Sequence, residues 1–102
     1  MTTARADLIT IGGSWSPNDE MPAVSAFGTG ATLANVAGDA ELVASAADLD
    51  RRYLVHAEGG QIWVSIAGAA STEPRGFLAS GKSVLINLRR GQSIRVAAAN
   101  LT

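Results

Sequence analysis

The strongest structural signal in this chain is QIWVSIA, at residues 61–67. Ile62 and Val64 alternate with Trp63 and Ser65, and successive side chains of a β-strand point to opposite faces of the sheet. The segment therefore predicts a strand whose aliphatic face lies in a core and whose other face carries Trp63.

The same alternation recurs on both sides of this segment. Short apolar runs lie between closely spaced glycines and prolines, which is typical of a β-sandwich or barrel. We predict an all-β fold of about eight short antiparallel strands in a jelly-roll-like β-sandwich. The clearest further strands are residues 52–58, 83–88 and 93–98, and the weaker ones are residues 7–11, 23–27 and 41–46.

Glycine-containing turns separate the strands of the second half. EGG at residues 58–60, ASG at 79–81 and RRG at 89–91 are each interpreted as the tight turn of a β-hairpin. GTG at residues 28–30 lacks the third glycine or the lysine of a phosphate-binding loop, so it is interpreted as backbone freedom at a turn. Residues 28–38, rich in glycine and alanine, show no clear pattern.

Residues 38–52, GDAELVASAADLDRR, leave an alternative open. Leu42, Ala46 and Leu49 have helical spacing, and the composition favours a helix. Polar residues from Ser45 onward interrupt that pattern, and a strong β pattern follows. We therefore prefer a strand followed by a loop, and allow at most one short helix in the chain.

The chain has 102 residues, which fits a single domain. We predict an N-terminal arm at residues 1–7 and one sandwich domain at residues 8–102. The arm has no apolar segment typical of a secretory signal, and no stretch approaches the roughly 18 apolar residues of a membrane helix. A soluble protein made in the cytoplasm is expected, without membrane contact.

Composition argues against several kinds of partner and stabilising group. The net charge is −1 and basic residues form no stripe, so nucleic acid is not expected as a partner. Cysteine is absent, which excludes disulfides and thiolate-held metals. A core this small gains stability readily from oligomerisation, so self-association is expected.

No motif indicates catalysis, a cofactor or a metal. His56 is the only histidine, and a catalytic or metal role would need partners that the sequence does not show. Asp48 and Asp50 supply fewer oxygens than calcium requires. No Gly-x-Ser-x-Gly motif occurs. We therefore predict a protein that is not an enzyme, with no catalytic, cofactor-binding or metal-ligating residues.

Four residues are candidates for contacts with a partner or ligand: Trp15, Trp63, Arg51 and Arg52. Trp15 lies in a polar loop, and both tryptophans could stack on carbohydrate or fill a core or a subunit interface. The arginine doublet marks either an interface or the solvated end of a strand.

The second half of the chain resembles a known kind of protein. From residue 51 to 99 the motifs are RRYLVHA, the EGG turn, QIWVSIA, a small-residue loop, FLASG and SIRVAA. This order resembles the small β-sandwich proteins encoded in the structural gene clusters of tailed bacteriophages. Those proteins serve as head decoration (cement) proteins, head-fibre bases or related virion components.

The resemblance implies a virion structural protein on the outer surface of the head, made in the host cytoplasm. As a capsid decoration protein, the chain would bind the major capsid protein, stabilise the capsid lattice and form a homotrimer. Residues 1–7 would then lie against the capsid or a neighbouring copy. The alternative is a tail-tip or fibre module that binds a host receptor or carbohydrate through Trp15 and Trp63.

Overall fold

The computed structural model describes residues 2–11, 24–44, 50–66, 68–72 and 74–99. These residues form eight β-strands and no helix, which confirms the predicted all-β fold. The strands are β1 (Thr3–Ile11), β2 (Val24–Leu33), β3 (Ala40–Val43), β4 (Arg51–Glu58), β5 (Ile62–Ser65), β6 (Gly76–Leu78), β7 (Ser83–Leu88) and β8 (Ile94–Ala98).

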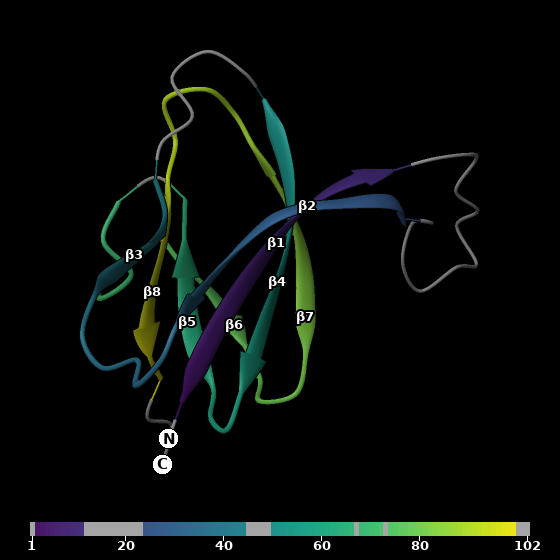
Figure 1. Ribbon diagram of the computed structural model, residues 1–102. Helices are drawn as coiled ribbons and strands as arrows, with labels where there is room; N and C mark the ends of the chain where they lie inside the picture. Colours follow the sequence, from purple (N-terminus) through teal and green to yellow (C-terminus); the bar gives the residue numbers. More distant parts are fainter. Residues whose placement is uncertain (1, 12–23, 45–49, 67, 73, 100–102) are drawn as a thin grey trace.

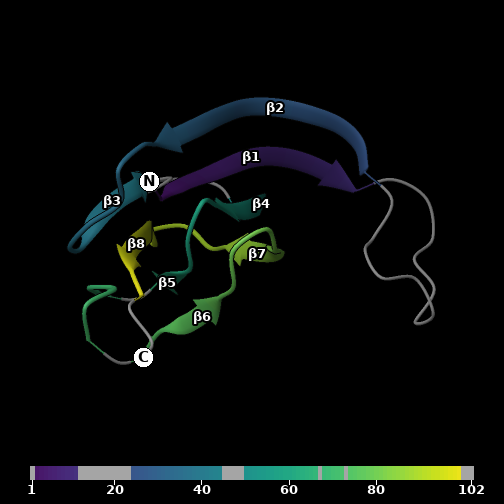
Figure 2. The same cartoon turned by 90° about the horizontal axis from the view of Figure 1, so that it is seen from below.

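The strands form two antiparallel sheets that pack face to face (Figures 1 and 2). Sheet A has the order β2-β1-β4-β7, and sheet B has the order β3-β8-β5-β6. Apart from the β1–β2 and β5–β6 hairpins, consecutive strands lie in different sheets. The strands occupy the positions of an eight-stranded jelly roll. The one difference is in chain order: the strand that comes last in an ordinary jelly roll comes first here, as β1.

The core lies between the sheets and is built from the inward face of each strand. In β4, Tyr53, Val55 and Ala57 are buried, and in β5 Ile62 and Val64 face them. A fully buried aliphatic side chain contributes about 1.5–3 kcal/mol relative to an exposed one. The largest fully buried side chains are Ile62, Leu88, Ile94, Val55 and Val96.

The predicted turns are in the right places, but the predicted hairpins are wrong. Gly59, Gly81 and Gly91 have φ values of 73°, 78° and 82°, the left-handed conformation that glycine adopts without a steric penalty. Each of these turns nevertheless joins strands of different sheets. A glycine turn reverses the chain, but it does not specify whether the next strand pairs in the same sheet or stacks on it.

The predicted N-terminal arm is also wrong for its described part. Residues 3–7 are the first half of β1, which pairs with both β2 and β4. Ala4 and Ala6 are fully buried in the core. Alanine contributes little to a hydrophobic pattern, so the inward face of this strand was not recognised. What projects instead is the far end of the β1–β2 hairpin (Figure 1), because β4 pairs with β1 only as far as Ile9.

The remaining ambiguous segment is resolved in part. Ala40–Val43 forms β3, as preferred over the helical alternative, whereas residues 45–49 lie outside the described residues.

Gly28 and Gly30 lie within β2 and not in a turn. Gly28 and Thr29 together stand opposite Leu8 in a β-bulge, and a Cβ at Gly28 would lie 2.9 Å from the Leu8 side chain.

Candidate interaction surface

The side of the sandwich between β6 and β7 contains an apolar groove, which we call the β6–β7 groove. Both strands are at the edges of their sheets, and β6 has only three residues. The groove has a volume of about 300 Å³. It is lined by Val64, Ile66, Pro74, Arg75, Gly76, Val84 and Ile86.

The groove arises because the inward face of β7 is incompletely covered. Val84, Ile86 and Leu88 share that face, yet Val84 is 40% exposed while Leu88 is completely buried. On the opposite wall, Gly76 has no side chain, and a Cβ there would meet nothing closer than the Val64 carbonyl oxygen at 3.9 Å. Aliphatic surface at this side therefore remains in contact with water.

An aromatic and cationic cluster adjoins the groove on the outer face of sheet B. The sequence correctly placed Trp63 on the face opposite Ile62 and Val64. The guanidinium carbon of Arg75 lies 3.9 Å from the centre of the Trp63 ring, and Phe77 meets the same ring edge-on at 5.6 Å. Such cation–π contacts contribute about 0.5–1 kcal/mol at exposed sites. Phe77 itself is 44% exposed.

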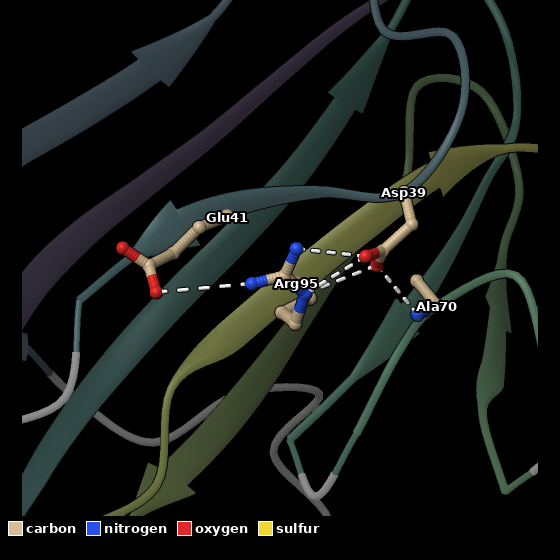
Figure 3. A network of polar contacts seen from close by, with 4 residues as sticks. All are labelled: Asp39, Glu41, Ala70 and Arg95. Atoms are coloured by element: carbon tan, nitrogen blue, oxygen red, sulfur yellow. Dashed lines mark hydrogen bonds and ion pairs between the residues drawn. The ribbon is translucent and has the colours of Figure 1, made fainter.

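A polar network joins Asp39, Glu41 and Arg95 to Ala70 (Figure 3), and Arg75 is bound to it through the Ala70 carbonyl. Asp39 Oδ2 accepts a 2.7 Å bond from Arg95, and Asp39 Oδ1 accepts a 2.7 Å bond from the Ala70 N–H. The Ala70 carbonyl in turn accepts a 3.3 Å bond from Arg75. Glu41 lies 3.9 Å from Arg95 and adds a second carboxylate.

The charges in this network stabilise each other. The hydrogen bond from Arg95 and the bond from the Ala70 N–H hold the pKa of Asp39 below its usual range, against a smaller opposing effect of desolvation. The hydrogen bond to Asp39 likewise raises the pKa of Arg95. Both groups are therefore ionised at neutral pH, and they fix the β5–β6 connection that carries Arg75.

The other predicted contact residues are not brought together with Trp63. Arg51 and Arg52, at the start of β4, line a separate polar hollow of about 450 Å³. Leu8, Ile9, Thr10, Asp50 and Asn87 complete its lining, so it shares no residue with the groove. Trp15 lies outside the described residues.

Sequence reasoning missed most of the groove and its cluster. Arg75, Phe77 and Val84 were not singled out, although the segment RGFL at residues 75–78 places a cation and an aromatic side by side. Alternation in β7 was recognised, but it predicts only which side chains face inward. Whether they are covered depends on which other segments of the chain pack beside them, which no pattern in the sequence specifies.

A second missed cluster joins Ser83, His56 and Glu58 on the outer face of sheet A. Ser83 Oγ lies 2.8 Å from His56 Nδ1, and His56 Nε2 lies 2.7 Å from a Glu58 oxygen. These are the residue types of a hydrolytic triad. The Glu58 side chain is 72% exposed, however, and none of the three lines the β6–β7 groove or the hollow at Arg51 and Arg52. The cluster is therefore interpreted as a cross-strand polar contact.

Within the described part of the chain, no three metal-ligating side chains converge. Nor does that part contain a helix long and apolar enough to cross a membrane. Fold and surface together define a small antiparallel β-sandwich with one apolar side next to an aromatic and cationic cluster. No protein-family model, curated protein or solved structure matches this chain.

Proposed function

We propose that this chain is a bacteriophage virion structural protein, and more specifically a capsid decoration protein that binds the outer surface of the head. The observation that carries the proposal is the β6–β7 groove with its exposed apolar rim. Such a groove is better suited to binding another protein than to catalysing a reaction. The resemblance of residues 51–99 to head decoration proteins supports the same assignment. The chain acts by binding and not by catalysis.

Exposed apolar side chains supply the binding energy in this proposal. Val84 lines the groove, and Phe77 lies in the cluster next to it. Phe27 pairs with Ile9 where the projecting part of the β1–β2 hairpin begins, and it is 68% exposed. Burying apolar surface contributes about 25 cal/mol per Å² before the costs of association are subtracted. Repetition over a capsid lattice converts such modest contacts into stiffness, because each copy bridges neighbouring subunits.

The two exposed regions have different roles in this proposal. The β6–β7 side contacts the major capsid protein, and the hairpin that carries Phe27 contacts neighbouring copies in a homotrimer. With a net charge of only −1, copies packed side by side repel each other little. The protein is made in the host cytoplasm and resides on the head surface.

Trp63 is poorly placed for the alternative function of a carbohydrate-binding module. A sugar stacks on an open aromatic face, but one face of the Trp63 ring is occupied by the Arg75 guanidinium. A ligand would have to displace that contact. We therefore favour a protein partner over a glycan.

The test uses heads assembled from the major capsid protein encoded in the same gene cluster. The purified chain is expected to co-sediment with these heads and to raise their disruption temperature. Phe77→Ser should lower occupancy, whereas Leu54→Ser, on the outer face of sheet A, should leave it unchanged. Absence of co-sedimentation, or binding to a glycan array that is lost in Trp15→Ala, would overturn the proposal.

A further inference from the structure

Strand β7 lies at an edge of sheet A. Among the described residues its only partner in that sheet is β4, and none of them pairs with its outer edge. The Ala57 N–H donates to the Lys82 carbonyl, and bonded pairs alternate along an antiparallel ladder. Val84 and Ile86 therefore direct their backbone groups toward β4, and Leu85 directs its N–H and C=O away from the sheet. Such an edge is a template for an added strand.

The β6–β7 groove lies directly beside this edge. Val84 and Ile86 line it from β7, with Val64 and Pro74 on the other wall. A strand added to β7 would alternate its side chains, so that every second one points into the space between the sheets. The groove thus offers an apolar site at the position where the side chains of an added strand would enter.

Cations flank the edge at both ends. Lys82 precedes β7, and Arg89 and Arg90 follow it. Arg75 stands at the groove, and among the described residues none of these four has a carboxylate within ion-pair distance. Glu58 contacts His56 instead, and Asp50 accepts a bond from the backbone N–H of Arg90.

These charges disfavour a second copy of the chain as the occupant. If two β7 strands paired antiparallel about a two-fold axis, Lys82 of each copy would lie next to Arg89 and Arg90 of the other. Like charges at both ends of a short ladder oppose pairing. The same charges attract a strand that carries carboxylates at its ends.

We propose that β7 binds an extended segment of another protein as an added fifth strand of sheet A. The segment has an apolar side chain that enters the β6–β7 groove and acidic residues at both ends that meet Lys82, Arg89 and Arg90. This inference rests on the proposed protein-binding function, which it deepens by specifying the partner: an apolar strand with acidic ends.

Flanking cations also occur on sheet edges simply to prevent aggregation. Protection of that kind requires only charges that prevent another strand from pairing with the edge. It does not account for an apolar groove beside the edge, with aliphatic side chains exposed to water. The two explanations make different predictions for a matched pair of peptides.

The probe is a synthetic peptide, Asp-Asp-Thr-Val-Thr-Val-Thr-Asp-Asp, and its counterpart has lysine in place of each aspartate. Isothermal calorimetry at low salt should show at least about tenfold tighter binding of the acidic peptide. Leu85→Pro removes the outward N–H and leaves the bonds to β4 intact, since proline is tolerated at such edge positions. It should abolish binding, whereas Leu85→Thr should retain it. Far-ultraviolet circular dichroism verifies that both variants fold.

Equal affinity for the two peptides, or no binding of either, overturns the inference. So does a dimer of the unmodified chain that Leu85→Pro converts to a monomer, because the occupant is then a second copy. Binding to heads is measured in a separate experiment, with Leu85→Pro and with the unmodified chain. If heads bind Leu85→Pro as well as the unmodified chain, the inference fails and the proposed function stands. If the acidic peptide binds but heads do not, the capsid assignment fails and the inference stands.

Discussion

The two long sides of this sandwich are built from similar aliphatic residues, yet one is closed and the other is open. On the β2–β3 side, Val36, Leu42 and Val43 are all less than 10% exposed. On the β6–β7 side, Val84 is 40% exposed and lines a groove of about 300 Å³. Side-chain composition therefore does not explain the difference.

The closed side owes its burial to the chain segment that covers it. The connection from β2 to β3 runs across the end of the sandwich, where the Val36 N–H donates to the Thr2 carbonyl at 2.8 Å and the Ala98 N–H donates to the Ala37 carbonyl at 2.7 Å. No comparable cover protects the described part of the β6–β7 side, where β6 is three residues long. The edge strands β3 and β6 are similarly short, with four and three residues, so the difference between the two sides follows from the covering connection.

The largest predicted effect tests this contrast within a single strand. Leu88→Ala and Ile86→Ala each delete three carbons from the inward face of β7. Leu88 is completely buried, so its truncation should cost about 2–5 kcal/mol of unfolding free energy. Ile86 lines the open groove, so its truncation should cost about 1 kcal/mol. Urea denaturation measures both values, and equal losses would mean that the groove is closed in solution.

The next effect concerns the network that connects the closed side to the open one. Asp39→Asn removes the ion pair with Arg95, and it loosens the segment whose Ala70 carbonyl binds Arg75. The matched control is Asp7→Asn, which breaks an ion pair with Arg5 inside one strand. Asp39→Asn should lower the midpoint of denaturation more. If Asp7→Asn lowers the midpoint more, the contacts of Asp39 with Arg95 and Ala70 do not stabilise the fold.

The contrast between the two sides also shows what the sequence could predict. Alternation identified β4, β5, β7 and β8, because each of these strands has one continuous apolar face. It failed for residues 3–7, where Ala4 and Ala6 carry the buried face. It also failed for Gly28 and Gly30, which lie inside β2. A Cβ at Gly28 would lie 2.9 Å from the side chain of Leu8 in β1, and this contact comes from a strand distant in sequence.

The candidate surface was harder to predict than the fold. Trp63 was identified because its position in an alternating strand sets the face on which it lies. Its partner Arg75 was not, because the pair forms only when the β5–β6 connection is folded back by Asp39 and Ala70, from distant parts of the chain. Local patterns specify the face of a strand, whereas a surface depends on long-range contacts.

Acid should weaken the closed side in a defined pH range. The bonds to Asp39 lower its pKa in the folded state below the 3.8 of an unperturbed aspartate. The unfolded chain therefore takes up this proton first, and the stabilisation by Asp39 is complete above about pH 4 and lost as the pH falls through the lower, folded value. The stability difference between the unmodified chain and Asp39→Asn should shrink over that range. A difference that stays constant down to about pH 2 would contradict the assignment.

The smallest expected effect concerns the contact between Arg75 and the Trp63 ring next to the open side. In a Trp15→Phe background, Trp63 is the sole tryptophan, so its fluorescence reports on its own surroundings. Arg75→Ala uncovers one face of the ring and should increase quenching by acrylamide, with a stability loss of about 0.5–1 kcal/mol. Arg75→Lys should be intermediate, because an ammonium keeps the charge but not the planar contact. Phe77→Leu should change quenching less than Arg75→Ala, since it removes only the ring-edge contact. Unchanged quenching in Arg75→Ala would mean that the ring face is open in solution, which would restore Trp63 as a stacking surface for a sugar.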